Sequence, residues 1–416
     1  MFLAVSMAFA ILVVNALVPV RREPLTVASF ALGWIPSELP LQVGAVEAIV
    51  TVAFAFDGAL RAWPGWVALA VGAATGAGWV ELVLAAHRSK SLVDRALADA
   101  TGGAISVDGL DPIPAWNRWW RLVIAVPFRF RGIRRTRNVD YWGDGNYRHK
   151  LDILTRRSPR AEHAPVLVYI HGGAWVIGDK RQQGIPMMHE LVQRGWVCVA
   201  VNYRLSPRAT WPAHIVDCKR AVAWVREHIA EYGGDPDFIA VSGGSAGGHL
   251  SSLLALTPND PEWQPGFEDL DASVDACLPF YGVYDMTVDP TRSGAYGPGL
   301  LDLLERRVMK TARSDNPALF EQASPDRRVT SAAPPMFVFH GTNDTLVPPA
   351  VGRYFADRLR QVSEAPVAYV ELPRAQHAFD VMASIRSRHT TMGAVQFLEG
   401  MRLRVAADPT SGPVPG

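Results

Sequence analysis

The chain has 416 residues, of which 49% are hydrophobic, and its formal net charge is +1. This length suits one large domain or two ordinary ones, and the apolar content can fill a sizeable core. A charge near zero gives no general electrostatic attraction to nucleic acid, so no nucleic-acid partner is expected. The three cysteines, Cys198, Cys218 and Cys277, are too few and too scattered for a disulfide framework or a zinc site, and we expect buried free thiols.

The apolar residues crowd into the first 86 positions. Phe2–Val20 carries no charge over nineteen positions, about the length of a membrane-spanning helix. Two arginines follow this run, whereas a secretory signal peptide begins with basic residues, so we expect a retained helix. Leu39–Leu60 is the expected second span, and Gly65–Ala86, rich in small residues, is the third. The sequence thus predicts about three transmembrane helices within residues 1–90.

Basic residues suggest an orientation for these spans. Arg21 and Arg22 follow the first expected span, Arg88 and Lys90 follow the third, and only Arg61 lies between the second and third. With three spans, the positive-inside rule places the two richer flanks and the rest of the chain in the cytoplasm. We therefore predict a multi-pass protein of the cell inner membrane. A fourth span would reverse the orientation.

Residues 91–137 are expected to form a linker followed by a basic aromatic segment. Tryptophans and arginines alternate in Trp116–Arg121, and no carboxylate occurs between Asp111 and Asp140. Interleaved rings and guanidinium groups suit the headgroup region of an anionic membrane. Nucleic acid is the rival partner for such a patch. Because three apolar helices precede it, we predict membrane lipid.

From residue 138 onward, expected strands alternate with expected helices. The expected strands are Val139–Trp142, Lys150–Leu154, Pro165–Ile170, Trp196–Asn202, Phe238–Val241, Met336–His340 and Ala368–Leu372, with helices near residues 182–193 and 215–231. This alternation predicts a mostly parallel sheet with helices on both faces. Ligands bind beyond the carboxyl ends of such strands, so functional side chains should directly follow strands.

One serine directly follows such a strand. Ser245 lies within a Gly-x-Ser-x-Gly pattern, from Gly243 to Gly247, between Phe238–Val241 and the helix-like Leu250–Leu254. This is the sequence pattern of a nucleophile elbow, in which a sharp turn holds the serine in a strained backbone conformation. Small neighbours are needed where the strand and helix crowd together. The pattern therefore predicts an accessible nucleophilic hydroxyl at the end of the strand.

Three further polar motifs also follow strands. His171–Trp175 follows a central strand, and its glycines would let backbone N–H groups approach a developing oxyanion. The oxyanion candidates are the N–H groups of Gly172, Gly173, Ala174 and Ala246. Asp344 and His377 follow the last two expected strands. The order serine, aspartate, histidine along the chain is that of α/β-hydrolases.

Five ordered motifs resemble those of α/β-hydrolase esterases of the hormone-sensitive-lipase-like group, and within it bacterial carboxylesterases and kynurenine formamidase-like enzymes. They are His-Gly-Gly-Ala-Trp at 171–175, Tyr-Gly-Gly-Asp-Pro at 232–236, Gly-Gly-Ser-Ala-Gly-Gly at 243–248, His-Gly-Thr-Asn-Asp at 340–344 and Gln-His at 376–377. Many relatives carry a third glycine at the position of Ala174 and an aspartate at the position of Gly244. These two differences shift the likeness toward the formamidase-like branch. The N-terminal composition is similar to that of membrane-associated carboxylesterases of actinobacteria.

The resemblance implies an α/β-hydrolase fold over residues 138–405 and a serine carboxylesterase or lipase. Ser245 would attack the ester, His377 would take its proton, and Asp344 would orient the imidazole. The implied substrates are small-molecule or lipid esters, with no metal or organic cofactor. An acyltransferase or a formamidase/amidase with the same triad, and a non-catalytic membrane binding module, stay open as alternatives.

The strand–helix order lapses over about residues 285–326, where this fold usually carries a cap insertion. Residues 406–416, rich in proline and glycine, are expected to be a disordered tail. Because every catalytic motif lies beyond Arg137, the sequence also predicts that a chain beginning there is soluble and active. Acyl length, natural substrate and oligomeric state are not specified by these patterns.

Overall fold

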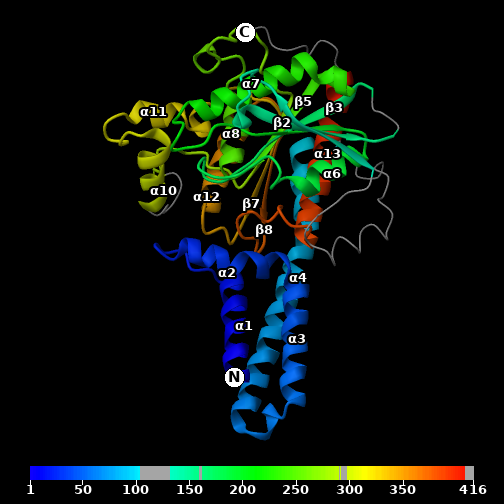
Figure 1. Ribbon diagram of the computed structural model, residues 1–416, viewed down its shortest axis with the longest axis vertical. Helices are drawn as coiled ribbons and strands as arrows, with labels where there is room; N and C mark the ends of the chain where they lie inside the picture. The colour runs from blue at the N-terminus through cyan, green and yellow to red at the C-terminus, as the bar shows by residue number, and fades with distance from the viewer. Residues whose placement is uncertain (104–131, 159–161, 290, 292–297, 408–416) are drawn as a thin grey trace.

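The computed structural model describes residues 1–103, 132–158, 162–289, 291 and 298–407. A helical bundle that carries the N-terminus projects from a larger domain built on one sheet (Figure 1). The helices are α1 Phe2–Leu17, α2 Thr26–Glu38, α3 Pro40–Phe56, α4 Trp63–Thr101, α6 Ile185–Gln193, α7 Ala213–His228, α8 Ala246–Leu256, α10 Pro298–Leu303, α11 Pro317–Gln322, α12 Pro349–Val362 and α13 Ile385–Ala407. The strands are β1 Ile133–Asp140, β2 Lys150–Arg156, β3 Ala164–Ile170, β4 Val197–Val201, β5 Gly234–Gly244, β6 Ala276–Phe280, β7 Met336–Gly341 and β8 Val367–Leu372.

The eight strands form one sheet in the order β1-β2-β4-β3-β5-β6-β7-β8. β1 pairs antiparallel with β2, and β2 pairs antiparallel with β4. The strands from β4 through β8 are all parallel. This mostly parallel mixed sheet confirms the predicted α/β-hydrolase architecture. It also brings the carboxyl ends of β3, β5, β7 and β8 to one edge.

The central strands β3, β4 and β6 are buried on both faces, which explains their apolar sequences. Alternate residues of β3 enter two different cores: Val166 and Val168 pack with α7, α8 and α12, whereas Leu167 and Tyr169 pack with α6 and α13. The predicted free thiols are confirmed, since Cys198, Cys218 and Cys277 are all buried and unpaired. β6 was absent from the expected elements; its five residues, interrupted by Pro279, form a short apolar run.

The bundle consists of α1, α3 and the first half of α4, which lie side by side (Figure 1). Gly78 of α4 approaches Val13 of α1 so closely that an added methyl group would lie 2.2 Å from the valine side chain. Glu47 of α3 is buried and accepts hydrogen bonds of 2.5 Å from both Thr75 and Trp79 of α4. Its carboxylate therefore ties two helices of the bundle together rather than lining a site.

The prediction of three membrane-spanning helices is not confirmed. In the part of the chain that the structure describes, one helix, α4, is long and apolar enough to cross a membrane. The broken pair α2 and α3 passes the same test only if its two halves, bent by 89°, count as one span. α1 has 16 residues, which rise about 24 Å, against a hydrocarbon core of about 30 Å.

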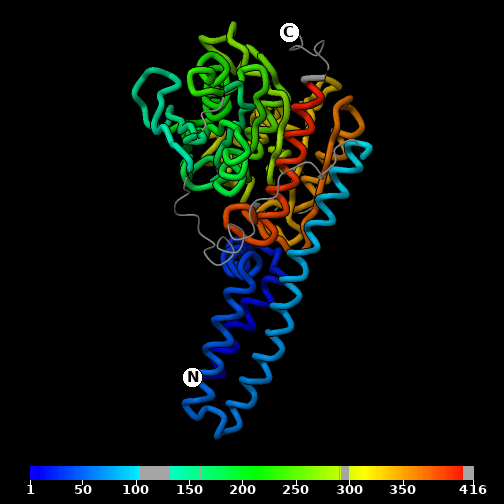
Figure 2. The backbone as a smooth tube through the Cα atoms, turned by 90° about the vertical axis from the view of Figure 1, so that its right-hand side faces the viewer, coloured from blue at the N-terminus to red at the C-terminus, as the bar shows by residue number. Residues whose placement is uncertain are grey.

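α4 belongs to both parts of the molecule. It continues as one helix of 39 residues past the boundary expected at residue 90. Val93 and Leu97 are buried in the core beside α6 and α13, and Figure 2 shows the cyan end of α4 beside the red α13. Residues 91–101 are thus a covering helix of the sheet, not a linker.

The described part of the expected cap insertion contains α10, a π-helical turn at Leu304–Met309, and α11. Leu304 and Val308 are buried in the core, whereas Asp302 and Arg306 on the outer side form an ion pair, so the amphipathic character expected there is found. The basic aromatic stretch Trp116–Arg121 lies outside the described residues, as do 408–416 of the expected tail.

Candidate active site

The strand β5 ends at the predicted elbow, and α8 begins immediately after Ser245. Ser245 has φ 57° and ψ −119°, a conformation that side-chain-bearing residues rarely adopt. A methyl group on Gly247 would lie 2.1 Å from the carbonyl oxygen of Ile170, so only glycine fits where α8 passes the end of β3. The local sequence therefore gives the serine the strained turn of a nucleophile elbow.

The loop after β3 lies against this elbow. A methyl group on Gly172 would be 2.4 Å from the carbonyl oxygen of Gly244 and 3.2 Å from Cβ of Ser245. The loop then passes through positive φ at Gly173, Ala174 and Trp175, with values of 120°, 52° and 58°. In this backbone conformation the N–H groups do not point toward partners in a helix or sheet. An oxyanion-binding loop requires N–H groups that are free in this way.

The structure narrows the predicted set of oxyanion donors. The N–H of Gly172 donates a 2.7 Å hydrogen bond to Oε1 of Gln183, so it holds the loop in place rather than facing a substrate. The N–H groups of Gly173, Ala174 and Ala246 stay predicted oxyanion donors. Gln183 is therefore a supporting residue that no sequence motif indicated.

A chain of hydrogen bonds through His249 supports the same loop. The indole N–H of Trp175 donates to Nδ1 of His249 at 3.2 Å, and Nε2 of His249 lies 2.8 Å from the carbonyl oxygen of Ala323. The histidine tautomer that satisfies both partners carries its proton on Nε2. Burial lowers the pKa of His249 to about 4, so it is neutral at physiological pH. His249, on α8, thus connects the candidate oxyanion loop, His171–Trp175, with Ala323 of the cap segment.

The structure brings Asp344 and His377 together at the ends of β7 and β8. Nδ1 of His377 lies 2.7 Å from Oδ2 of Asp344. Burial by itself would raise the pKa of Asp344, but His377 and His340 outweigh it and hold that pKa below its ordinary range. The N–H groups of Leu346 and Val347 also donate to Oδ1 of the aspartate. Asp344 is therefore an ionised, fixed partner for the imidazole.

Tyr281 connects this pair to the elbow. Its ring lies 4.5 Å from the His377 ring, centroid to centroid. A methyl group on Gly244, the residue before Ser245, would lie 2.6 Å from the Tyr281 hydroxyl. That hydroxyl donates a hydrogen bond to the buried Asp380, and burial raises the pKa of Asp380 to about 6 despite this bond and the nearby His377. The serine turn and the imidazole thus border the same tyrosine.

Residues of the N-terminal region also line the site, which no motif predicted. Phe30 of α2 meets the His377 ring edge-on at 6.1 Å, and the Trp34 indole donates to the carbonyl oxygen of Ala378 at 2.9 Å. Asn343, beside the aspartate, donates to the carbonyl oxygens of Ala16 and Leu17. Pairings between positions more than 300 residues apart leave no local signature in a single sequence.

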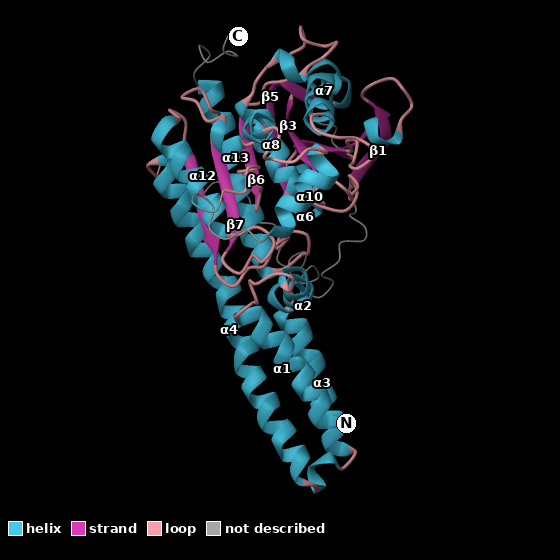
Figure 3. Ribbon diagram, turned by 90° about the vertical axis from the view of Figure 1, so that its left-hand side faces the viewer, coloured by secondary structure: helices cyan, strands magenta, loops and turns pink. Residues whose placement is uncertain are grey.

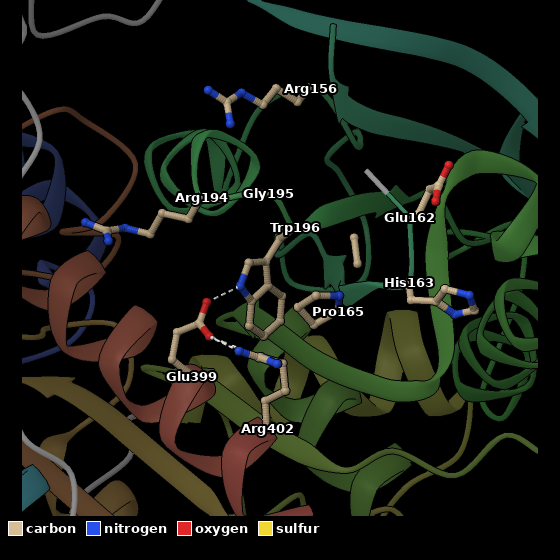
Figure 4. A pocket seen from close by; sticks show the side chains of 10 residues that line it. Arg156, Glu162, His163, Pro165, Arg194, Gly195, Trp196, Glu399 and Arg402 are labelled. Carbon is tan, nitrogen blue, oxygen red and sulfur yellow. Dashed lines mark hydrogen bonds and ion pairs between the residues drawn. The ribbon is translucent and has the colours of Figure 1, made fainter. Parts of the chain in front are cut away.

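An open depression of about 310 Å³ lies elsewhere, at the amino ends of β3 and β4 (Figure 4). Glu399 in this depression accepts a hydrogen bond from Trp196 at 2.6 Å and forms an ion pair with Arg402 at 3.2 Å. Because the candidate residues follow the carboxyl ends of the strands, this depression is not part of their site.

Comparisons with known proteins agree with the fold and motifs. The BD-FAE family model matches residues 151–359. The chain is similar to the probable carboxylic ester hydrolase LipM of Mycobacterium tuberculosis, with 43% identity over 99% of this chain and 95% of that protein. It is also similar to esterase LipQ of the same organism, with 49% identity over 66% of this chain and 64% of that protein.

Among solved structures, Thermogutta terrifontis esterase 2 phosphonylated by sarin aligns with a TM-score of 0.53 and 23% identity, over 70% of this chain and 99% of that one. This likeness supports the α/β-hydrolase fold. The family model matches half of the chain, and the similarity to LipM covers nearly all of it. These two matches therefore identify the family as well as the fold. The chain belongs to the BD-FAE family and is a carboxylic ester hydrolase.

Proposed function

We propose that the protein is a membrane-anchored serine esterase that hydrolyses carboxylic esters through an acyl-enzyme on Ser245. The observation that carries this proposal is the 2.7 Å contact between His377 and an ionised Asp344, beside the strained turn at Ser245. With Nδ1 bound to the aspartate, Nε2 of His377 is the nitrogen available as general base.

In the proposed reaction, Oγ of Ser245 attacks the ester carbonyl while Nε2 of His377 takes the serine proton. Gly173, Ala174 and Ala246 donate their N–H groups to the oxyanion. The tetrahedral intermediate collapses, the proton passes to the leaving alcohol, and an acyl-serine remains. Water then attacks this ester with the same histidine as base, which releases the carboxylic acid and restores the serine.

Exposed apolar side chains support membrane anchoring. The bundle presents Ile11, Val14, Ile49, Phe56 and Val80, each more than half exposed. Contiguous apolar surface of this kind is costly in water and marks a membrane or protein contact. The apolar length of α4 agrees with a lipid environment. The basic flanks expected from the sequence favour a cytoplasmic active site, which protease protection in sealed cells would test.

Activity of the full chain in detergent toward p-nitrophenyl butyrate tests the chemistry. Ser245→Ala should reduce hydrolysis by about three orders of magnitude or more. Adding a competing alcohol separates the alternatives, because an acyltransferase forms a new ester at the expense of free acid. Faster release on a formamide substrate than on an ester would favour the amidase alternative. Activity of Ser245→Ala within about tenfold of the wild type would refute the proposal.

A further inference from the structure

α2 lies across the end of the helical bundle that meets the sheet domain (Figure 3). Its residues Phe30 and Trp34 contact His377 and Ala378. The helix meets α3 at an angle of 89°. If α1, α3 and α4 stand along the bilayer normal, as the proposed anchoring requires, α2 lies parallel to the membrane surface. Its place in the fold is therefore that of an interfacial helix beside the active site.

The inner face of α2 is fixed to the catalytic loops. Ser29 and Gly33 are buried on this face against Asn15 of α1, and the neighbouring Phe30 and Trp34 contact His377 and Ala378. At its C-terminal end, Glu38 forms a fully buried ion pair with Arg386. These contacts hold one face of the helix against the site and leave the opposite face outward.

The outer face of α2 is entirely apolar. Its exposed residues follow the helical spacing i, i+1, i+4, i+5 and i+8, which is one continuous stripe. They are Val27, Ala28, Ala31, Leu32 and Ile35. The exposed fractions of Val27, Leu32 and Ile35 are 64%, 44% and 45%. A surface helix in water would carry charged residues on this stripe, and α2 carries none there.

We infer that this outer face of α2 lies in the membrane surface, and that the enzyme's substrates are esters dissolved in the bilayer, which reach Ser245 along this helix. The inference rests on the proposed function and adds the substrate class. Val18, which follows α1, and Leu41, at the start of α3, are exposed apolar residues on either side of α2, at 71% and 52%. The acyl chain of such an ester stays in lipid while its carbonyl meets the catalytic loops beside Phe30.

The test uses the full chain reconstituted in phosphatidylcholine vesicles and two substrates. One is a fluorogenic oleate ester dissolved in the vesicles, and the other is water-soluble p-nitrophenyl butyrate. Leu32→Asp places a charge on the stripe without touching the catalytic loops. It should slow oleate hydrolysis by about tenfold and leave butyrate hydrolysis within about twofold. Leu403→Asp, at an exposed apolar position on α13, is the control and should change neither rate.

Unchanged hydrolysis of both esters by Leu32→Asp would overturn the inference, because the stripe would then not contact lipid. An equal loss on both esters would also overturn it, since α2 would then act only through the catalytic loops. Conversion of an oligomer to monomers by the substitution would assign the stripe to a second copy of the chain instead. Failure of the proposed function looks different: Ser245→Ala would retain hydrolysis of both esters.

Discussion

The indole N–H of Trp34 donates a 2.9 Å hydrogen bond to the carbonyl oxygen of Ala378, the residue after His377. Ala378 has φ 60°, a conformation that needs outside support in a residue with a side chain. A helix of the proposed membrane region thus helps to hold the turn that carries the candidate general base. The N-terminal region therefore packs against the candidate site and is also a candidate anchor.

Trp34→Phe removes this donor and keeps the ring. A net hydrogen bond contributes about 1 kcal/mol, so we expect kcat for p-nitrophenyl butyrate to fall by about tenfold or less, with little change in KM. Trp66→Phe, at an exposed position of α4, is the matched control. If both variants retained the wild-type kcat, the Trp34 contact would have no part in positioning His377.

His249→Phe interrupts the chain of hydrogen bonds from Trp175 to Ala323 while keeping a buried ring. The oxyanion loop would lose its anchor on α8, so kcat should fall by about tenfold, with KM nearly unchanged, since the loop acts on the transition state. Steady-state kinetics with a short ester measures this. His228→Phe on α7, which lies away from the loop, should behave as wild type. A selective rise in KM would instead place His249 in substrate binding.

Asp380 should make stability depend on pH. Its folded pKa is about 6, above the ordinary value of 3.8. The folded state therefore binds this proton more tightly, so stability is greatest at low pH and is lost as the pH rises from about 4 to about 6. A difference of this size between the folded and unfolded pKa values corresponds to about 3 kcal/mol. Asp380→Asn should raise the melting temperature at about pH 7.5 and change it little at about pH 4.

Asp344→Asn is the control, because it should change the pH dependence of stability in the opposite direction. The pKa of Asp344 is lowered in the folded protein, so its stabilising contribution exists above the unfolded pKa and is lost as the pH falls. This variant should therefore lower the melting temperature at about pH 7.5. Equal pH profiles of melting temperature for the Asp380→Asn and Asp344→Asn variants would contradict both assignments.

A chain that begins near Arg137 should fold poorly, contrary to the expectation from the motifs alone. In the full chain, Val93 and Leu97 of α4 are each only 1% exposed. Without α4, the surfaces of β8 and α13 that cover these two side chains would be exposed to water. Burial of side chains of this size contributes about 1.5–3 kcal/mol each. Circular dichroism and esterase activity in detergent would measure the loss. A soluble shortened chain with wild-type activity would contradict this packing argument.

Much of the fold could be predicted because apolar runs mark buried parallel strands. Pro165–Ile170 and Met336–His340 have that pattern, and both are strands of the sheet. The same pattern located the turns that carry the site, since polar residues directly follow the strands. Asp344 and His377 were assigned to one site on that ground, and the structure brings them together, although their catalytic roles stay predictions.

Other features depend on contacts that a single sequence does not record. The sequence of α2 is apolar and short, so it gave no sign that Phe30 meets His377. Gly172 fitted the oxyanion motif, but Gln183, eleven residues later, takes its N–H. α4 was expected to end near residue 86 because its hydropathy changes there, yet the backbone stays helical to Thr101. In each case tertiary packing decided what local composition could not.

The most direct test of the central claim is covalent capture of the nucleophile. The full chain in detergent is treated with a fluorophosphonate, which phosphonylates an activated serine and mimics the tetrahedral intermediate, and is then examined by peptide mass spectrometry. We predict one adduct on Ser245, formed in parallel with loss of esterase activity and absent from the Ser245→Ala variant. Inactivation with the adduct on another serine, or full activity of a chain labelled at Ser245, would contradict an acyl-enzyme at this position.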